Sequence, residues 1–205
     1  MTMKKDYIED IQGGERRTWL SPVEVRAEGD AQYFEGMAVP FGEITDLGYF
    51  SEEISRDAFS EVLKDDVRGL FNHDPDVILG RSAAGTMKLT VNEKGVFYRI
   101  SYNPNDPDHV RVMEKVKRGD VSQSSYAFTV KNETWGKRDG KAHRTIEKIA
   151  RWYDVAPVTY PANPNTTVAK RSLDNVQAEL NKENERAARQ RQIAVEIDRI
   201  KLGIF

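Results

Sequence analysis

The chain has 205 residues, 39% of them hydrophobic, which is enough for one buried core and a smaller appendage. Its net charge is −2 and it contains no cysteine, which excludes a disulfide framework, a thiolate nucleophile and a cysteine-ligated metal. The sequence shows no basic stripe that would suit a phosphate backbone, and no apolar run approaches the ~20 residues of a membrane span. We therefore expect a cytosolic protein that binds neither nucleic acid nor membrane.

The N-terminal residues 1–18 are polar and contain Gly13-Gly14, which predicts a flexible arm. Beyond them, short segments alternate between apolar and polar residues with a period of two, the pattern of half-buried strands. Turn signals at Gly95 and at Asp139-Gly140 predict two hairpins. The predicted strands cover residues 23–28, 33–41, 86–91, 95–102, 125–130 and 145–155.

Two short helices are expected between these strands. The first is predicted in "ISRDAFSEVLKD", residues 54–65, with Ser55 as its N-cap. The second lies in "NDPDHVRVMEKVKRG", where Asp106 can cap the helix, Pro107 fits the first turn and Gly119 fits the position after the last turn. Its predicted apolar face comprises Val110, Met113 and Val116. Many short strands with intercalated helices are typical of a small barrel or sandwich.

The sequence changes character after Pro164. Residues 171–205 contain no proline and no glycine before Gly203, which predicts an amphipathic helical tail of about 30 residues. An apolar stripe lies at each end of this helix, and the turns between them are polar on nearly every face. Since no core can hold those central turns, we expect the helix to project or to pair with a partner helix.

Among the three histidines, His109 and His143 lie in polar segments and are expected to be exposed. His73 instead follows the apolar residues 69–71, so it can be half-buried and oriented, as a general base must be. The alternative is that His73 only caps the turn "NHDPD". With Asp74 and Asp76 it could also bind a metal, although no second histidine stands at a helical spacing.

Three serines, Ser122, Ser124 and Ser125, crowd the segment "GDVSQSSYAF". Strand alternation places Ser125 on the face opposite Tyr126 and Phe128, and the aromatic face should be core. Ser125 then points to solvent or to a cleft. Serine becomes a nucleophile only when a neighbouring base accepts its proton, so a catalytic role requires a histidine within hydrogen-bond reach.

A single carboxylate, Asp154, stands in the apolar segment "IARWYDVAPV". Burying an unpaired charge is costly, so this residue needs a partner. Arg151 is one candidate. The other is the Nδ1–H group of a catalytic histidine.

Four segments in this order resemble one family, the prohead (capsid maturation) serine proteases of HK97-like tailed phages. The resemblance covers about residues 20–168. The segments are "FEGMAVPFGEITDLGYFSEEISRDAF", "LFNHDPDVILGRSAAGTMKLTVNEKGVFYRI", "VKRGDVSQSSYAFTV" and "YDVAPVTYPANPNT". The sequence departs from the family pattern in three places: Gln123-Ser124 replaces Gly-Met, Ala127 replaces Gly, and Ala156-Pro157 replaces Ser and the residue after it. In addition, Asp154 stands where the family usually has glutamate.

The resemblance implies a serine endopeptidase domain over residues 19–170, with Ser125 as nucleophile, His73 as base and Asp154 as third member, and with no cofactor or metal. Backbone N–H groups at Gly80-Arg81 or beside Ser125 are candidates for the oxyanion hole. The implied fold is a small closed β-barrel of about seven strands ringed by short helices, similar to the herpesvirus assemblins.

The implied substrates are the scaffolding segment of the major capsid protein and the protease itself, inside the assembling procapsid in the host cytoplasm. A second class of function stays open. In that alternative the barrel is a non-catalytic scaffold or chaperone for capsid assembly, and the long C-terminal helix is its working part. Under either function, the C-terminal helix is a candidate site of self-association.

Overall fold

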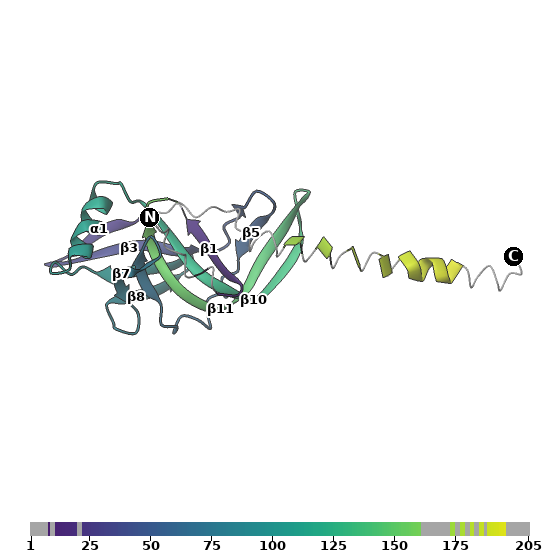
Figure 1. Cartoon of the computed structure of the whole chain (residues 1–205), viewed down its shortest axis with the longest axis horizontal. Coiled ribbons are helices and arrows are strands. Elements are labelled where there is room, and N and C mark those ends of the chain that lie inside the picture. The colour runs from purple at the N-terminus through teal and green to yellow at the C-terminus, as the bar shows by residue number, and fades with distance from the viewer. Residues whose placement is uncertain are drawn as a thin grey trace, which may run out of the picture. The chain divides into compact units, whose positions relative to one another are not determined.

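The computed structural model describes residues 8, 11–19, 22–160, 173–174, 177–178, 181–182, 185–186 and 188–195. They belong to two units, Met1–Thr166 and Thr167–Phe205 (Figure 1). In the second unit the described residues are helical. The rest of the helix predicted over residues 171–205 lies outside the described residues.

The larger sheet of the first unit is built around two long antiparallel strands. These are β10 (Gln123–Arg138) and β11 (Lys141–Val158). They are joined at the predicted Asp139-Gly140 turn, where both residues have positive φ, 52° and 78°. The edge of β10 away from β11 pairs with β1 (Gly14–Trp19). Residues 14–18, assigned to a flexible arm from the sequence, are therefore part of a strand.

The other edge of β11 is shared by two parallel neighbours. β5 (Ser51–Ile54) pairs with its first half and β6 (Arg68–Phe71) with its second half. β4 (Thr45–Asp46) then pairs with β5, and β7 (Asp74–Arg81) with β6. The sheet therefore brings β1, β10, β11, β6 and β7 side by side, and these strands carry the candidate site.

The smaller sheet is antiparallel and has the order β2-β3-β9-β8. Its strands are β2 (Glu24–Glu28), β3 (Ala31–Pro40), β8 (Met87–Asn92) and β9 (Gly95–Ser101). The predicted β8–β9 hairpin is confirmed. Gly95 is required there by a close approach, since a Cβ atom on it would lie 2.0 Å from the Val39 carbonyl oxygen.

The two sheets share one core, to which Phe34 of β3, Tyr98 of β9, Phe128 of β10 and Trp152 of β11 all contribute. In the described part of the chain no strand pairing joins one sheet to the other. The prediction of a closed barrel is therefore wrong. Strand alternation indicates which face of each strand is buried, but it does not determine which strand edges pair.

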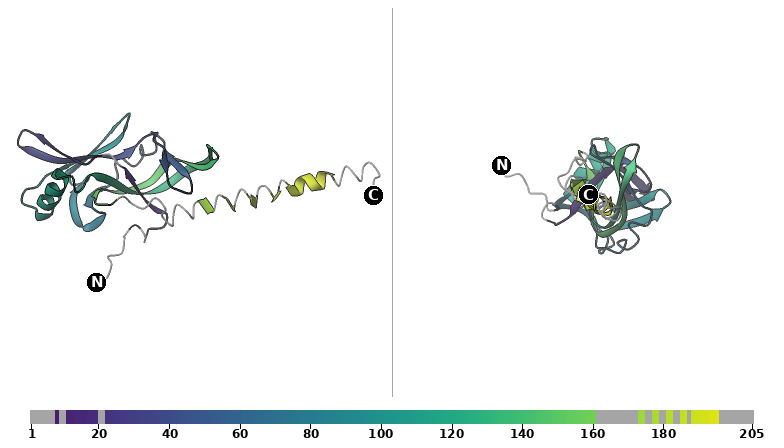
Figure 2. Two further views of the ribbon diagram at one scale, coloured as in Figure 1. Left: turned by 90° about the horizontal axis from the view of Figure 1, so that it is seen from above. Right: turned by 90° about the vertical axis from the view of Figure 1, so that its right-hand side faces the viewer.

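The predicted helix before the serine cluster is confirmed as α1 (Pro107–Lys117). The Asp106 carboxylate accepts a hydrogen bond from the Asp108 N–H group, and Gly119 follows the helix with φ 81°. The buried face comprises His109, Val112, Met113 and Val116, whereas Val110 is 39% exposed. Figures 1 and 2 show α1 at the end of the unit opposite the tip of the β10–β11 hairpin.

The helix predicted over residues 54–65 is wrong, because residues 56–64 form consecutive turns. Their backbone bonds span three residues, as from the Ala58 N–H to the Ser55 carbonyl and from the Val62 N–H to the Phe59 carbonyl. Phe59 is buried edge-on against Trp152. Core packing thus holds this segment in a tighter conformation than its local pattern favours.

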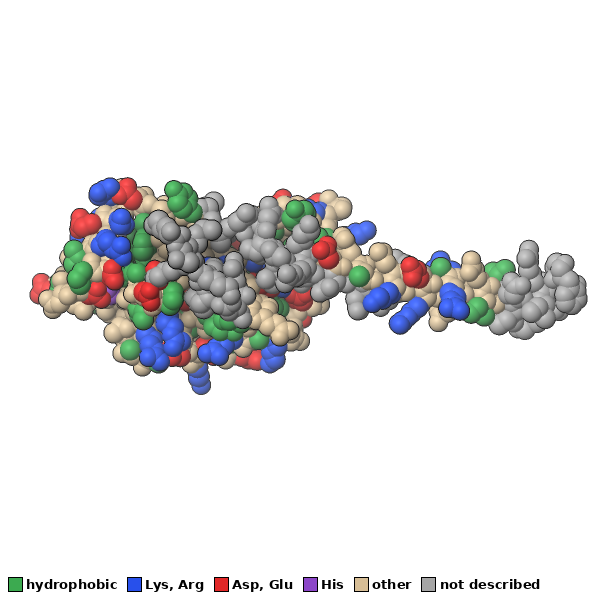
Figure 3. Space-filling view, in the orientation of Figure 1, with side chains coloured by type: hydrophobic (Ala, Val, Ile, Leu, Met, Phe, Trp, Pro, Cys, Tyr) green, Lys and Arg blue, Asp and Glu red, His purple; other side chains and the backbone are tan. Residues whose placement is uncertain are grey.

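Acidic and basic side chains are intermixed on the face shown in Figure 3, which agrees with the net charge of −2. None of the helices in the described part of the chain combines the length and apolar character needed to cross a membrane.

Candidate active site

His73 occupies the tight turn between β6 and β7. Phe71 pairs with Asp74, so Asn72 and His73 form a two-residue hairpin loop. Both have positive φ, 54° and 56°, as a type I′ turn requires. This conformation costs a non-glycine residue about 1–2 kcal/mol, and asparagine and histidine tolerate it better than most residues.

Asn72 fastens this turn to the end of β11. Its N–H group donates to the Pro157 carbonyl at 3.0 Å, and its side-chain amide donates to Thr159 Oγ1 at 3.1 Å. In return the Thr159 N–H group donates to Asn72 Oδ1 at 2.8 Å. These three bonds hold the imidazole of the next residue, His73, beside β11.

The structure brings together the three predicted site residues. His73 Nδ1 lies 2.7 Å from Asp154 Oδ1, and His73 Nε2 lies 2.7 Å from Ser125 Oγ. Ser125 is 1% exposed and Asp154 is fully buried. We refer to these residues as the Ser–His–Asp cluster. The alternative partner of Asp154, Arg151, instead has its guanidinium over the Tyr153 ring.

The hydrogen bonds determine which nitrogen of His73 accepts a proton. A carboxylate only accepts hydrogen bonds, so Nδ1 must donate to Asp154, which leaves Nε2 as an acceptor for the Ser125 hydroxyl. The Arg17 carbonyl is a second acceptor, 3.0 Å from Ser125 Oγ. The single Ser125 hydroxyl proton cannot form a full hydrogen bond to both acceptors at once. The hydroxyl must therefore turn away from the Arg17 carbonyl before its proton can pass to His73.

Ser124 points to the other face of β10. Its hydroxyl lies 2.9 Å from the buried Tyr98 hydroxyl, inside the core between the two sheets. Ser122 is exposed, and its carbonyl accepts a bond from the Val23 N–H group. Of the three clustered serines, only Ser125 contacts a histidine through a hydrogen bond that the structure describes.

The cluster opens into a cleft of about 320 Å³. Ser125 and His73 line this cleft, together with Arg16, Asn72, Val158, Thr159 and Tyr160. Partial burial lowers the pKa of Arg16 to about 10, and the negative charge of Asp154 opposes that change. The positive charge of Arg16 therefore lies within electrostatic range of the cluster.

A second serine–histidine pair lies between β5 and β11. Ser51 Oγ is 2.8 Å from His143 Nδ1, and His143 Nε2 is 3.8 Å from Glu53 Oε1. The latter distance is too long for a hydrogen bond, so the acid orients this histidine less firmly than Asp154 orients His73. Because Ser51 nevertheless contacts a histidine, it is the rival nucleophile that an experiment must distinguish from Ser125.

Sequence reasoning missed the environment of two histidines. His109 is buried against Phe34, with its Nδ1 accepting a bond from the Asn103 N–H group, and His143 is largely buried beside Ser51. Both predictions of exposure are wrong. A polar sequence neighbourhood does not reveal which side of an element a histidine lies on.

Two other site hypotheses fit the geometry less well. A metal at His73 would have to displace Asp154 or Ser125, because both ring nitrogens already have these partners. The Asp74 carboxylate instead accepts a bond from the Asp76 N–H group. As for the oxyanion hole, the Arg81 N–H group donates to Thr86 Oγ1 at 2.9 Å. The backbone beside Ser125 is also engaged, because β10 pairs there with β1 on one edge and with β11 on the other.

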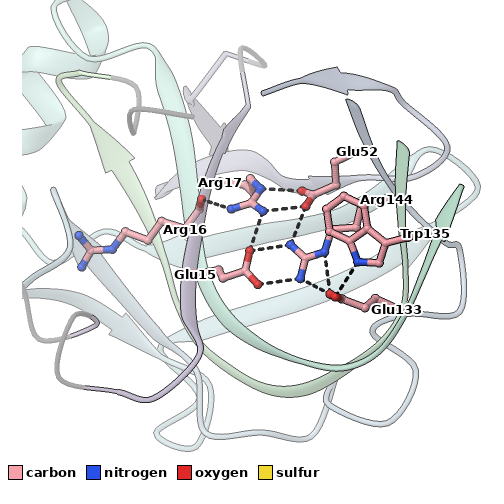
Figure 4. Close-up of polar contacts among 7 residues, drawn as sticks. All are labelled: Glu15, Arg16, Arg17, Glu52, Glu133, Trp135 and Arg144. Atoms are coloured by element: carbon pink, nitrogen blue, oxygen red, sulfur yellow. Dashed lines mark hydrogen bonds and ion pairs between the residues drawn. The ribbon is translucent and has the colours of Figure 1, made fainter. Parts of the chain in front are cut away.

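A buried ionic network that the sequence analysis did not foresee anchors β1 next to the cluster (Figure 4). The Arg17 guanidinium donates to both carboxylate oxygens of Glu52 at 2.6 and 2.7 Å, and to Glu15 at 2.7 Å. The Arg144 guanidinium donates to Glu15, Glu52 and Glu133. The network therefore links β1, β5, β10 and β11, and it holds the strand whose Arg17 carbonyl contacts Ser125.

We predict that Glu15 makes the stability of the protein depend on acid pH. Burial alone would raise its pKa, but Arg17 and Arg144 outweigh burial and lower the pKa from 4.5 to about 2. Because the folded pKa is the lower one, the stabilisation is present above pH 4.5 and is lost as the pH falls towards 2. The expected loss is about 3 kcal/mol of unfolding free energy, measured by urea denaturation at several pH values.

Glu15→Gln is the control for this effect. Its unfolding free energy should depend less steeply on pH below 4.5 than that of the wild type. Equal slopes for the two proteins would show that Glu15 keeps an ordinary pKa.

The match to a protein-family model agrees with these features. A family model described as caudovirus prohead serine protease matches residues 21–179, a range that contains the whole Ser–His–Asp cluster but not β1. A comparison with curated proteins finds no match. The solved structure of the bacteriophage T4 capsid assembly protease is similar over 72% of this chain and 98% of that chain, with 14% identity and a TM-score of 0.44.

Proposed function

Because this chain belongs to the caudovirus prohead serine protease family, we propose that it is an endopeptidase whose nucleophile is Ser125. The observation that carries the proposal is the continuous hydrogen-bonded line from Ser125 Oγ through the His73 imidazole to the Asp154 carboxylate. Both contacts are 2.7 Å long, and Ser125 and His73 line a cleft of about 320 Å³.

In the proposed mechanism, His73 Nε2 accepts the Ser125 proton while Oγ attacks the scissile carbonyl carbon. Asp154 keeps the proton of the neutral imidazole on Nδ1 and stabilises the imidazolium that forms. His73 then donates the proton to the leaving amine, which breaks the peptide bond and leaves an acyl group on Ser125. Water, deprotonated by the same histidine, releases the new carboxylate and restores the hydroxyl.

The proposed substrates are the scaffolding segment of the major capsid protein and the protease itself, within the assembling procapsid. Family membership supports a role in capsid maturation. A capsid protein co-expressed with the wild-type chain should appear shortened in an intact mass spectrum. The same capsid protein co-expressed with Ser125→Ala should keep its full length.

Labelling with a fluorophosphonate tests the choice of nucleophile directly. We expect mass spectrometry of the labelled chain to find the adduct on Ser125, because only a serine activated by a base reacts readily. His73→Ala should slow the labelling by about 10²–10⁴-fold, since it removes the general base. Ser125→Ala should abolish labelling.

Ser124→Ala and Ser51→Ala are the matched controls, and both should be labelled like the wild type. An adduct on Ser51 would transfer the catalytic role to the pair with His143. A chain that folds but gains no adduct would instead favour the non-catalytic scaffold or chaperone.

A further inference from the structure

We propose that a second hollow beside the Ser–His–Asp cluster is a subsite for an apolar side chain of the substrate polypeptide. This proposal rests on the proposed protease function. The hollow has a volume of about 310 Å³ and is lined by Arg68, Leu70, Pro75, Ile78 and Tyr153. We call it the β6–β7 subsite, after the strands that supply four of these residues.

A small buried apolar cluster connects the lining of the β6–β7 subsite with the lining of the cleft at Ser125. Ala156 of β11 lies directly opposite Ser125 in the strand register and forms a buried cluster with Leu70 and Val158. Leu70 lines the subsite and Val158 lines the cleft, so this small cluster forms a shared apolar floor. On β7, Ile78 is the cross-strand partner of Leu70, which extends the same face by one more strand.

The chemistry of the lining favours an apolar occupant. Leu70 is buried at the base, whereas Ile78 is 52% exposed and gains most from being covered. Covering apolar surface is favourable in proportion to the area removed from water. Arg68, the charged residue of the lining, is already paired with Asp66, at 3.2 Å to its carboxylate and 2.7 Å to its carbonyl. An acidic substrate side chain would have to compete with Asp66 for it.

The spacing matches an extended peptide that crosses the strands. Neighbouring strands lie about 4.8 Å apart, so β6 and β7 are about 10 and 14 Å from β10. An extended chain advances about 3.3 Å per residue, so a peptide cleaved at Ser125 would place a residue about three or four positions from the scissile bond over the subsite. The occupant is therefore the apolar side chain at that distance.

Cleavage-site profiling tests the subsite. The full-length chain is incubated with a proteome-derived peptide library, and mass spectrometry identifies the bonds that are cut. We expect Leu, Ile, Val, Met and Phe to be enriched three or four residues from the cut bond. Ile78→Asp should lower kcat/KM about 10-fold for peptides apolar at that position, and much less for peptides with alanine there.

Val91→Asp is the matched control, because Val91 is an equally exposed strand residue, 48% exposed, but lies on β8 in the other sheet. It should keep both the profile and kcat/KM of the wild type. Melting temperatures and fluorophosphonate labelling of each variant show that the fold and Ser125 are intact.

The outcomes separate the subsite from the proposed function. An active wild type without enrichment at those positions, or an Ile78→Asp profile equal to that of the wild type, would overturn the subsite alone. A wild type that cuts no peptide and gains no adduct would overturn the protease function, and the subsite with it. If Ile78→Asp only converts a dimer to a monomer in light scattering and leaves the profile unchanged, the hollow is an interface between copies and the proposal is wrong.

Discussion

Asp154→Asn is expected to lower kcat about 10⁴-fold, because the asparagine amide would hold His73 in the wrong tautomer. In the wild type, the Asp154 carboxylate accepts a hydrogen bond from the Nδ1–H group of His73 at 2.7 Å. This leaves Nε2 unprotonated, so that it can accept the Ser125 proton. Asparagine can donate its amide proton to Nδ1, which places the imidazole proton on Nε2, where it blocks transfer from the serine. Steady-state cleavage of a peptide that the wild type cuts measures kcat, and the rate of fluorophosphonate labelling should fall in parallel.

Asp154→Glu is the matched control, since it keeps the negative charge and is the residue that the family resemblance places at this position. It should be at least about 10²-fold more active than Asp154→Asn, despite the strain of one extra methylene in a fully buried site. Both variants need unfolding transitions that show a folded protein. An asparagine variant that is folded and retains wild-type kcat would remove Asp154 from the mechanism.

Local sequence patterns identified the three residues of the cluster as candidates, and the family resemblance then selected them from the alternatives. Strand alternation correctly placed Ser125 opposite Tyr126 and Phe128, and a lone carboxylate in an apolar strand correctly indicated a buried partner for Asp154. The type I′ turn at Asn72 and His73 could not be predicted in the same way, because neither of its two positive-φ positions is a glycine. Its backbone is stabilised instead by bonds to β11, which lies more than 80 residues away in the sequence.

β1 shows why other features could not be predicted. In "GERRTW" the charged residues Glu15 and Arg17 resemble an exposed segment, and charged residues are rarely buried without partners. Those partners, Glu52 and Arg144, are 35 and 129 residues away, and each is itself an ordinary charged residue in its own segment. Only the pairing of β1 with β10, and of β5 with β11, brings the charges together.

The same limit explains the error in the predicted barrel. The alternating segments located all four strands of the smaller sheet and the long hairpin, because burial on one face imposes a period of two. The way β11 divides its second edge between β5 and β6 depends on long-range register. The register of short parallel strands cannot be predicted from the local pattern of a single sequence.

Arg144→Met is expected to lower the free energy of unfolding by about 3–5 kcal/mol, the usual cost of leaving a buried charge without its partner. Arg144 is 1% exposed and donates to Glu15 at 2.8 Å and to Glu52 at 2.9 Å. Without it, Arg17 alone would have to balance these two buried carboxylates. Methionine fills a similar volume, so a loss of this size would report on charge and hydrogen bonds more than on packing. Urea denaturation at pH 7 measures the change.

A double-mutant cycle separates charge balance from the loss of the side chain itself. Adding Glu15→Gln to Arg144→Met removes one negative charge together with the positive one, so the double variant should be more stable than the sum of the two single losses predicts. An additive result would show that Glu15 and Arg144 do not interact. Since the same network holds β1, whose Arg17 carbonyl contacts Ser125 Oγ at 3.0 Å, Arg144→Met should also change the rate of Ser125 labelling at temperatures where the variant is still folded.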